Sequence, residues 1–257
     1  MSDLSGKVVF ISGAAKGIGA MTARAMAKAG ATVVIGDIDT DGAQAVADEI
    51  GGSALKLDVT AEADWTAAMA EVKDRHGRLH GLVNNAGIMI SKPFILTTLE
   101  DLHKTNAVNV DGVFLGMKAA APLMHESGGG SIVNLSSIFG QVAGPMHSAY
   151  CASKGAVRLL TKSVGTELFR MGWAVRVNSV HPGPVDTELG MGAIDVAVDL
   201  GLVKDRETGK AMVDAQHPMG RMAVPSDICG AILFLLSEAS GFMTGTELTV
   251  DGGYTAV

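Results

Sequence analysis

The sequence predicts a single α/β domain in which a parallel sheet is covered by helices on both faces. Short runs of aliphatic and β-branched residues alternate with longer segments of helical periodicity. The short runs are apolar on both faces, which is typical of strands buried on both sides. Many of the 33 glycines stand where strands would meet helices. Because crossovers between parallel strands are right-handed, the alternation favours a doubly wound, seven-stranded sheet.

The predicted elements follow one another in strict alternation for most of the chain. Seven short apolar segments are predicted as strands, at residues 7–12, 32–36, 54–57, 81–84, 131–135, 174–180 and 248–250. Six longer segments with helical periodicity lie between them, at residues 17–29, 40–50, 61–76, 101–126, 149–171 and 225–236. No linker interrupts this order, so residues 1–257 are predicted as one domain.

One segment breaks the alternation. Residues 184–222 form a long, partly apolar insertion after the sixth strand. In a doubly wound sheet the ligand lies beyond the carboxyl ends of the strands, so an insertion there is predicted to be a substrate lid. The alternative is a pair of surface helices without a role in binding.

Composition excludes several kinds of protein. The chain is 47% hydrophobic and 18% charged, with a net charge of −7, and it carries no basic runs with interleaved aromatic residues. This balance argues against nucleic acid or an anionic membrane as a partner. The longest apolar run, at residues 228–236, is far short of the roughly 20 residues of a membrane span. No signal peptide is recognised at the start of the chain, which favours a cytoplasmic protein.

The two cysteines support the same compartment. Cys151 and Cys229 are too few for a disulfide scaffold, and they lack the spacing of metal ligands. We therefore expect reduced thiols, as in cytoplasmic proteins, and no metal site.

A glycine-rich loop follows the first strand. It reads S-G-A-A-K-G-I-G, with Gly13, Gly17 and Gly19 spaced as G-x-x-x-G-x-G. Glycines let the backbone approach a pyrophosphate, whose charge is stabilised by the amino end of the next helix. A simple turn is the alternative, but the position between first strand and first helix favours dinucleotide binding.

The residue at the end of the second strand indicates which dinucleotide is bound, NAD(H) or NADP(H). Asp37 stands there, and a carboxylate at this place accepts hydrogen bonds from both ribose hydroxyls and repels a 2′-phosphate. Lys16 in the loop acts weakly in the opposite direction, since a base could bind that phosphate. We expect the carboxylate to prevail, which predicts NAD(H) rather than NADP(H). Asp58-Val59 after the third strand and N-N-A-G after the fourth, residues 84–87, would line the same groove.

A tyrosine and a lysine are spaced for acid–base chemistry. Tyr150 and Lys154 are four residues apart, which puts both side chains on one face of a helix. An ordinary tyrosine has a pKa of about 10. A neighbouring ammonium and the positive ring of an oxidised nicotinamide would lower this pKa. The pair therefore predicts Tyr150 as general base in alcohol oxidation and general acid in ketone reduction.

Two further polar residues are candidates for the same site. Ser137, at the carboxyl end of the fifth strand, could hydrogen-bond the substrate oxygen, although a helix-capping or turn serine is the alternative. Asn109 is an unusual residue for a helix interior, and a water bridging it to Lys154 would open a proton path to solvent.

With these motifs the chain resembles the short-chain dehydrogenase/reductase family over essentially its whole length. The family's T-G-x-x-x-G-x-G loop is matched with Ser12 in place of threonine, and its N-N-A-G motif is intact. Its catalytic tetrad corresponds here to Asn109, Ser137, Tyr150 and Lys154. After Thr187 the chain has Glu188 where many relatives have proline.

The resemblance implies a Rossmann fold, a metal-free hydride transfer with NAD(H), and a homotetramer packed through the helices at 101–126 and 149–171. Lys154 would also hold the nicotinamide ribose, and the Thr187 hydroxyl would meet the nicotinamide carboxamide. The implied cofactor-binding residues are Gly13, Lys16, Gly17, Ile18, Gly19, Asp37, Ile38, Asp58, Val59, Asn85, Ala86, Gly87, Tyr150, Lys154, Pro182, Gly183, Val185 and Thr187.

The predicted pocket walls are almost all apolar and include no obvious arginine or lysine. They are Met89, Ile90, Phe139, Val142, Met146, His147, Leu189, Met191 and Ile194. We therefore expect a neutral, hydrophobic secondary alcohol or ketone, such as a cyclic alcohol, a hydroxysteroid or an aryl ketone. The alternatives are a reductase of acyl thioesters or sugars, which needs a basic or polar rim, a lyase or epimerase, and a non-catalytic NAD-binding regulator. His181 is expected to pack or hydrogen-bond rather than to act as a base.

Overall fold

The computed structural model describes residues 3–256, and it is organised around one parallel sheet. The strands lie in the order β3-β2-β1-β4-β5-β6-β7, and every neighbouring pair is parallel. Their bounds are β1 Val8–Ser12, β2 Thr32–Asp37, β3 Ser53–Lys56, β4 Gly81–Asn84, β5 Gly130–Leu135, β6 Val175–Pro182 and β7 Glu247–Val250. The predicted doubly wound sheet of seven strands is confirmed.

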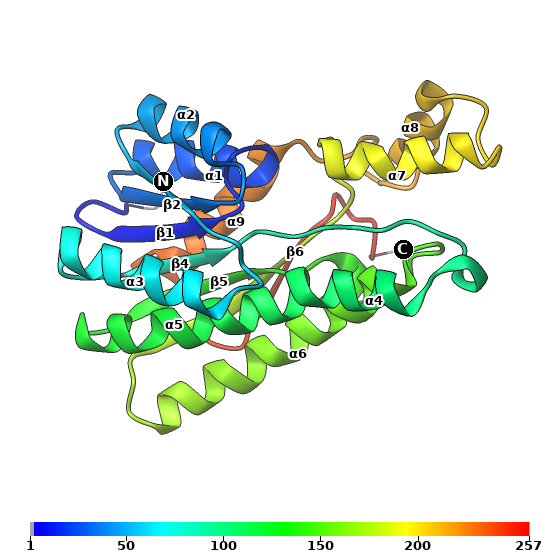
Figure 1. Cartoon of the computed structure of the whole chain (residues 1–257). Coiled ribbons are helices and arrows are strands. Elements are labelled where there is room, and N and C mark those ends of the chain that lie inside the picture. The colour runs from blue at the N-terminus through cyan, green and yellow to red at the C-terminus, as the bar shows by residue number, and fades with distance from the viewer. Residues whose placement is uncertain (1–2, 257) are drawn as a thin grey trace.

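Helices cover both faces of this sheet (Figure 1). Helices α1, α2 and α9 pack on one face, and α3, α5 and α6 pack on the other. The helices are α1 Gly17–Lys28, α2 Thr40–Ile50, α3 Glu62–His76, α4 Leu99–Asn106, α5 Gly112–Glu126, α6 Ser148–Arg170, α7 Glu188–Asp199, α8 Arg206–Ala215 and α9 Pro225–Leu236. Within residues 3–256 none of them is long and apolar enough to cross a membrane.

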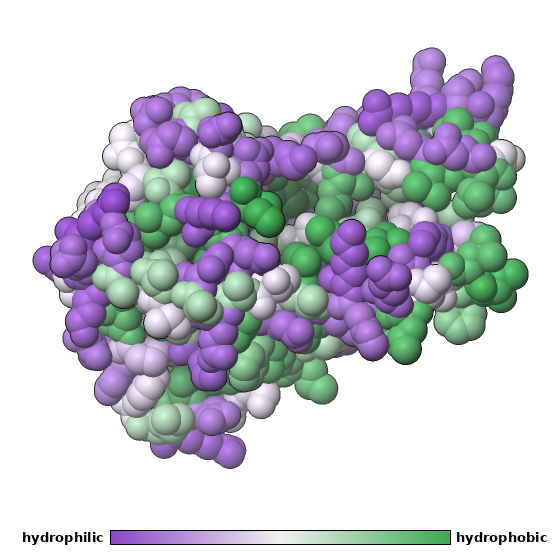
Figure 2. Space-filling model, viewed as in Figure 1, coloured by the Kyte–Doolittle hydropathy of each residue, from purple (hydrophilic) through white to green (hydrophobic). Residues whose placement is uncertain are grey.

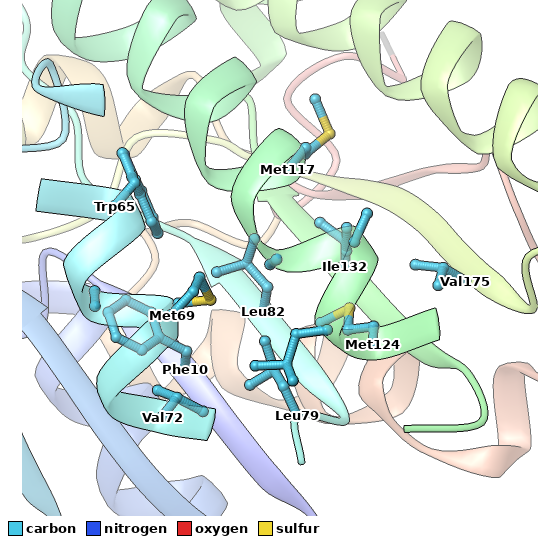
Figure 3. Packing of buried hydrophobic residues seen from close by; sticks show 14 of the residues in the cluster. Phe10, Trp65, Met69, Val72, Leu79, Leu82, Met117, Met124, Ile132 and Val175 are labelled. Carbon is cyan, nitrogen blue, oxygen red and sulfur yellow. The ribbon is translucent and has the colours of Figure 1, made fainter. Parts of the chain in front are cut away.

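Two apolar layers hold the strands and helices together. Figure 3 shows the layer beneath β1, β4 and β5, where side chains from α3 and α5 interlock with those of the strands. The ring centroids of Phe10 and Trp65 are 5.8 Å apart, and Met124 is fully buried at the far end of α5. Burial of this kind is the main source of folding free energy, and it makes the sheet a rigid base for the loops above it.

The predicted helix at 101–126 is in fact two helices. Helix α4 begins at a capping box formed by Thr98 and Asp101, and a π-helical segment, Ala107–Asp111, separates it from α5. The segment contains Asn109, the residue that looked out of place in a helix. A π-turn changes the direction of a side chain and is frequent at functional sites.

Strand ends also differ by one or two residues from the prediction. The second strand extends to Asp37, and the sixth extends to Pro182, so that His181 lies inside β6 rather than beyond it. The cause is pairing with neighbouring strands, which a propensity pattern does not contain: His181 pairs with Thr249 of β7.

The order of the strands positions a binding site. The chain moves outward from β1 to β3 and then returns to place β4 on the other side of β1. In doubly wound sheets ligands bind at the carboxyl edge near such a switch point. The segment predicted as a lid forms α7 and α8, which rise above this edge beside the sheet body (Figure 1).

Candidate active site

The carboxyl ends of the strands open into a cleft of about 1050 Å³. Its walls come from the segments that follow β1 to β6, from α7 and α8, and from Tyr254 near the end of the chain. Figure 2 shows the surface hollowed between the lid and the sheet body, with hydrophobic residues along the hollow. The predicted groove and the predicted pocket are therefore one continuous space.

The glycine-rich loop lines this cleft through residues that include Gly13 and Gly17. Gly13 has a φ of +69°, and a Cβ there would lie 2.6 Å from the Cα of Ala86. A Cβ on Gly19 would lie 2.2 Å from the Gly13 carbonyl oxygen. Helix α1 begins at Gly17, so its first backbone N–H groups are directed toward the cleft. Only glycine allows this approach, and the cradle fits a pyrophosphate.

Polar contacts fix the loop against the N-N-A-G segment. The Ser12 hydroxyl oxygen accepts hydrogen bonds from the backbone N–H groups of Asn85 and Ala86, at 3.2 and 3.3 Å. The Asn85 amide donates to the carbonyl oxygens of Gly13 and Ser12, at 2.6 and 3.1 Å. Ser12 thus supplies the hydroxyl that the family's threonine has at this position.

The two acidic residues of the groove stand where the sequence predicts them. Asp37 ends β2, and its carboxylate accepts hydrogen bonds from the backbone N–H groups of Ala15 and Asp39, at 2.9 and 3.0 Å. Asp58 accepts hydrogen bonds from the backbone and hydroxyl of Thr60, which lower the pKa of its carboxyl group. Both carboxylates line the cleft.

Lys16, the one predicted cofactor residue that could favour a 2′-phosphate, has a partner. Its Nζ lies 2.5 Å from a carboxylate oxygen of Glu188, the first residue of α7. Both side chains are largely exposed, and the contact raises the pKa of the Lys16 ammonium. An ion pair therefore joins the glycine-rich loop to the first residue of α7.

Tyr150 and Lys154 lie side by side on the buried face of α6. The Lys154 Nζ is 5.6 Å from the centroid of the Tyr150 ring and donates a hydrogen bond of 2.7 Å to the carbonyl oxygen of Leu135. Both residues line the cleft, with exposed fractions of 9% and 4%. Four-residue spacing on one helix produces this arrangement, as the sequence predicts.

Without a bound cofactor, burial shifts the pKa values of both Tyr150 and Lys154. Desolvation raises the pKa of Tyr150 to about 12, and the nearby Ser137 hydroxyl acts in the opposite direction. Desolvation lowers the pKa of Lys154 to about 8. The direction for Tyr150 is opposite to the expected lowering, because removal of a phenolate from water outweighs the neighbouring groups. The expected lowering depends on the positive charge of a bound nicotinamide.

Asn109 is fully buried beside the pair and does not line the cleft. Its Oδ1 accepts from the backbone N–H of Ile88, and its Nδ2 donates to the carbonyl oxygen of Ile88 and to the hydroxyl of Ser153. A Cβ on Gly87 would lie 3.3 Å from Asn109 Oδ1 and 3.5 Å from Lys154 Nζ. The hydrogen bonds of Asn109 therefore hold the segment after β4 in place, and this segment lies next to Lys154.

Ser137 stands where the chain leaves β5. Its hydroxyl oxygen accepts a hydrogen bond of 3.1 Å from the Phe139 backbone, which starts the 3-10 turn Ile138–Gly140. The serine therefore acts as a cap, which was the alternative expectation, and it also faces the cleft and contacts Tyr150. The oxygen that caps the turn keeps its proton free for donation.

The cofactor residues that the family resemblance implies converge on this cleft. Seventeen of the eighteen line it, and the exception is Gly19, which packs behind Gly13. Four of them lie at or just after the end of β6: Pro182, Gly183, Val185 and Thr187. The Thr187 hydroxyl also caps α7 by accepting from the backbone N–H of Gly190, at 3.2 Å.

The predicted substrate pocket is only partly brought together. Five of its residues line the cleft: Met89, Phe139, His147, Leu189 and Ile194. The other four, Ile90, Val142, Met146 and Met191, do not. Val142 is exposed to solvent, and Met191 is buried within the lid. Met146 has a φ of +67°, and its carbonyl oxygen accepts from the Lys92 backbone, so the loop turns this residue away from the predicted position.

Several residues of the cleft wall, which together we call the outer cleft, could not be identified from the sequence. They are Pro145, Val203, Met212, Val213, Gln216 and Tyr254. Four of the six lie on the segment 203–216, where an amphipathic pattern indicates a helix but not the surface it faces. His147 stacks on Phe139, and burial lowers the pKa of its imidazole.

Comparisons with known proteins agree with this geometry. A family model described as Enoyl-(Acyl carrier protein) reductase matches residues 13–255. The cyclopentanol dehydrogenase of Comamonas testosteroni is 41% identical over 261 residues, covering 100% of both chains. A crystal structure of a short-chain type dehydrogenase/reductase from Mycobacterium marinum has a TM-score of 0.88 and 38% identity, covering 99% of this chain and 98% of that one. The chain belongs to the short-chain dehydrogenase/reductase family.

Two other members are as similar. The 3-alpha-(or 20-beta)-hydroxysteroid dehydrogenase of Mycobacterium tuberculosis is 41% identical over 98% of this chain and 91% of its own length. The NADP-dependent (R)-specific alcohol dehydrogenase of Lentilactobacillus kefiri is 39% identical over 100% of both chains. The recognised resemblance is confirmed, and one of these relatives is NADP-dependent.

Metal-ligating side chains do not gather in this family member. Among residues 3–256 no group of three or more histidines, cysteines, aspartates or glutamates could hold a metal ion. The two cysteines are free thiols, and Cys229 is buried against Thr22. The polar groups that line the cleft include the carboxylates of Asp37 and Asp58, the hydroxyls of Ser137 and Tyr150, and the ammonium of Lys154.

Proposed function

We propose that the protein is an NAD-dependent oxidoreductase that interconverts a hydrophobic secondary alcohol and its ketone, with Tyr150 as general acid and base. One observation carries the proposal: the phenol of Tyr150, the ammonium of Lys154 and the hydroxyl of Ser137 meet in a cleft that continues into the glycine cradle. A bound nicotinamide would accept or supply the hydride next to these groups.

The residues of the chain then have separate tasks. Ser137 donates a hydrogen bond to the substrate oxygen and stabilises the charge that develops on it. Tyr150 takes the hydroxyl proton during oxidation and returns it during reduction. Lys154 favours the phenolate by its charge and is predicted to hold the nicotinamide ribose. Asn109 holds the segment after β4 in place, and a water between Asn109 and Lys154 remains a prediction for proton exchange with solvent.

Removal of the phenol hydroxyl tests the acid–base assignment. Tyr150→Phe should leave less than a few per cent of turnover, since acid–base catalysis contributes about 10²- to 10⁴-fold. NADH binding, followed by fluorescence, should be nearly unchanged because the ring remains. Cys151→Ala, the adjacent position on the same helix, is the matched control and should retain most of the activity. Turnover above a few per cent in Tyr150→Phe would refute the acid–base role.

The preference for NAD(H) rests on charge. The Asp37 carboxylate at the end of β2 would accept from the ribose hydroxyls and repel a 2′-phosphate. Lys16 is the cation that would favour the phosphate, and its pairing with Glu188 offsets this attraction. The Lentilactobacillus relative is NADP-dependent, so the family alone does not decide the cofactor.

The cofactor preference has a direct measurement. The ratio of kcat/KM with NAD to kcat/KM with NADP should be well above one. Asp37→Asn should reduce this ratio by about tenfold or more, since a like charge beside the phosphate is removed. Glu188→Gln should reduce it by a smaller factor, because exposed ion pairs contribute at most about 1 kcal/mol. A wild-type ratio that favours NADP would overturn the assignment.

A neutral, hydrophobic substrate fits the outer cleft. Besides His147, the only basic residues that line it are Lys16, which is paired with Glu188, and Lys154, which is buried. The relatives include dehydrogenases of cyclopentanol and of hydroxysteroids. We therefore propose cyclic alcohols, hydroxysteroids or aryl ketones as the substrate class. A panel of such compounds, followed by the absorbance of NADH, would rank them.

The acyl-thioester alternative has one observation in its favour, the printed description of the matching family model. An acidic carrier protein or a phosphopantetheine arm would need free cations at the mouth of the cleft. The ion pair of Lys16 and Glu188 does not provide them. Turnover of an acyl thioester at a higher kcat/KM than that of any alcohol in the panel would favour this alternative.

We further propose a cytoplasmic homotetramer. Large apolar side chains are exposed on the outer faces of α5 and α6, among them Phe114, Leu159 and Phe169. The family resemblance implies packing through these two helices, and burial of such side chains stabilises permanent interfaces. The free thiols of Cys151 and Cys229 suit a reducing compartment. Light scattering should give four times the mass of the 26.3 kDa chain.

A further inference from the structure

The ladder between β5 and β6 ends just before the candidate active site. Its last pair is Leu135 and Val180, and the backbone N–H of Ser136 adds one more hydrogen bond, of 2.9 Å, to the Val180 carbonyl. Ser137 then leaves the sheet with an extended backbone, at φ −165° and ψ 160°. Its carbonyl oxygen accepts from the Gly140 N–H of the following turn, but it has no partner in a strand.

A histidine side chain supplies the missing contact. His181 is the next residue of β6, it is 0% exposed, and its Nδ1 lies 3.0 Å from the Ser137 carbonyl oxygen. Its Nε2 lies 2.8 Å from the hydroxyl of Ser179, two residues earlier on the same face of the strand. Both ring nitrogens are therefore engaged in the interior of the sheet.

The partners determine which nitrogen carries the proton. A carbonyl oxygen only accepts, so Nδ1 must be the N–H that donates to Ser137. Nε2 then accepts from the Ser179 hydroxyl if the ring is neutral. Burial favours the neutral ring by lowering the pKa of His181. The charged groups that act on the ring are Glu247 of β7 and Arg158 and Lys154 of α6, whose effects are of both signs.

We propose that His181 is a positioning residue for catalysis: its Nδ1–H holds the Ser137 backbone so that the serine hydroxyl stays against Tyr150 and the substrate oxygen. The inference rests on the proposed roles of Ser137 and Tyr150. His181 touches neither substrate nor cofactor, since it does not line the cleft. The His181 side chain holds the Ser137 backbone by a hydrogen bond beyond the end of the β5–β6 ladder. The Ser137 hydroxyl needs this support because a catalytic group must be positioned within a fraction of an ångström.

His181→Leu removes the ring without leaving an orphaned polar group. The Ser137 carbonyl keeps the Gly140 N–H, and the Ser179 hydroxyl keeps the Thr246 carbonyl as an acceptor, at 3.4 Å. This variant should therefore fold, which thermal unfolding and NADH binding check. We expect kcat to fall about 10- to 100-fold, as for misplacement of a catalytic group, with KM changed by less than about threefold.

Two variants separate positioning from packing. His181→Asn offers an amide N–H near the place of Nδ1 and should recover most of the lost kcat, although it fills less volume than leucine. Ser179→Ala removes the partner of Nε2 but leaves the bond to Ser137, and it should keep near wild-type turnover. Equal losses in His181→Asn and His181→Leu, both folded, would overturn the proposal.

A double-mutant cycle and a pH profile complete the test. In a Ser137→Ala background His181→Leu should cost less than about twofold, because the residue acts only through Ser137. The limb of the kcat/KM profile that belongs to Tyr150 should move to higher pH in His181→Leu, since the Ser137 hydrogen bond that favours the phenolate is weakened. Full additivity, or an unmoved limb, contradicts the proposal. The proposed function fails separately, if Tyr150→Phe retains turnover.

Discussion

Helix α6, which carries Tyr150 and Lys154, and helices α7 and α8 of the predicted lid line the same cleft but are held in different ways. The buried face of α6 packs against β6 and the apolar layer below the sheet, through residues such as Val157 and Leu168. The lid has a small apolar cluster of its own, in which Met191, Ile194 and Met222 are buried. Its ion pairs to the rest of the chain are exposed, like that of Lys16 and Glu188.

We expect the firmly packed helix α6 to serve the chemical step, and the loosely packed helices α7 and α8 to serve substrate binding. The acid–base groups that we propose must keep their distances, and the packed core favours this because it holds Tyr150 and Lys154 on one buried helix. A substrate wall must adapt and admit the ligand, and segments with few buried contacts open at low free-energy cost. Changes in the two regions should therefore affect different measured quantities.

The largest effect on kcat is expected for Lys154, which is buried in the core and lines the cleft. Lys154→Met should lower kcat by about 100-fold or more, since the charge that favours the phenolate is lost. The same change should raise stability at pH 7 by about 1–3 kcal/mol, because a buried ammonium with a pKa lowered to about 8 is removed. Kinetics and thermal unfolding measure the two effects, and Lys118→Met, an exposed lysine of α5, is the control.

The stability gain has a defined pH dependence. Between pH 8 and 10.5 the unfolded chain binds a proton at Lys154 that the folded protein has released, so wild-type stability rises across this window relative to the variant. The advantage of Lys154→Met should therefore shrink from pH 8 toward pH 10.5. The raised pKa of Tyr150 is present in both proteins and cancels. An advantage that is equal at pH 7 and pH 10 contradicts the lowered pKa.

A change in the core far from the cleft should affect stability alone. Met124→Ala, in α5 at the opposite edge of the sheet, leaves a cavity in the layer shown in Figure 3 and should cost about 2–4 kcal/mol of unfolding free energy. The kcat and KM of the folded protein at 25 °C should stay within about twofold of wild type. Denaturant unfolding and steady-state kinetics check both halves. A large rise in KM would mean that the core transmits strain to the site.

The smallest effect is expected in the lid, and it should appear in KM. A Cβ on Gly209 of α8 would lie 2.5 Å from the Ile194 side chain, so Gly209→Ala must push α8 away from α7. We expect KM to rise about three- to tenfold, with unfolding free energy changed by less than about 1 kcal/mol. Gly192→Ala is the control, because a Cβ on this α7 glycine meets no atom within 4 Å. Equal kinetics in the two variants would mean that the α7–α8 spacing does not shape the pocket.

Much of the fold and the inner site could be predicted because their signals are local. Alternating periodicity identified all seven strands, and the glycine spacing located the cradle of Gly13 and Gly19. Four-residue spacing placed Tyr150 and Lys154 on one face of α6. Periodicity did not reveal the π-helical break at Asn109, because buried hydrogen bonds to Ile88 and Ser153 hold that side chain.

The outer pocket could not be predicted in the same way. Met146 and Val142 are near Tyr150 in sequence, but a turn with positive φ directs the chain so that neither lines the cleft. Tyr254 lies more than a hundred residues away and does line it. Sequence distance is a poor guide here because loops are oriented by long-range contacts, such as that of the Lys92 backbone with Met146.

The amino-acid sequence by itself determined the sheet, the glycine cradle, the acid at the end of β2 and the spacing of Tyr150 and Lys154, because each depends on residues close along the chain. Only the tertiary structure decided the charge state of Tyr150, the partner of Lys16, the walls of the outer cleft and the contact of His181 with Ser137. These depend on burial and on the meeting of distant segments, and free energies of desolvation and hydrogen bonding exist only once that packing has formed.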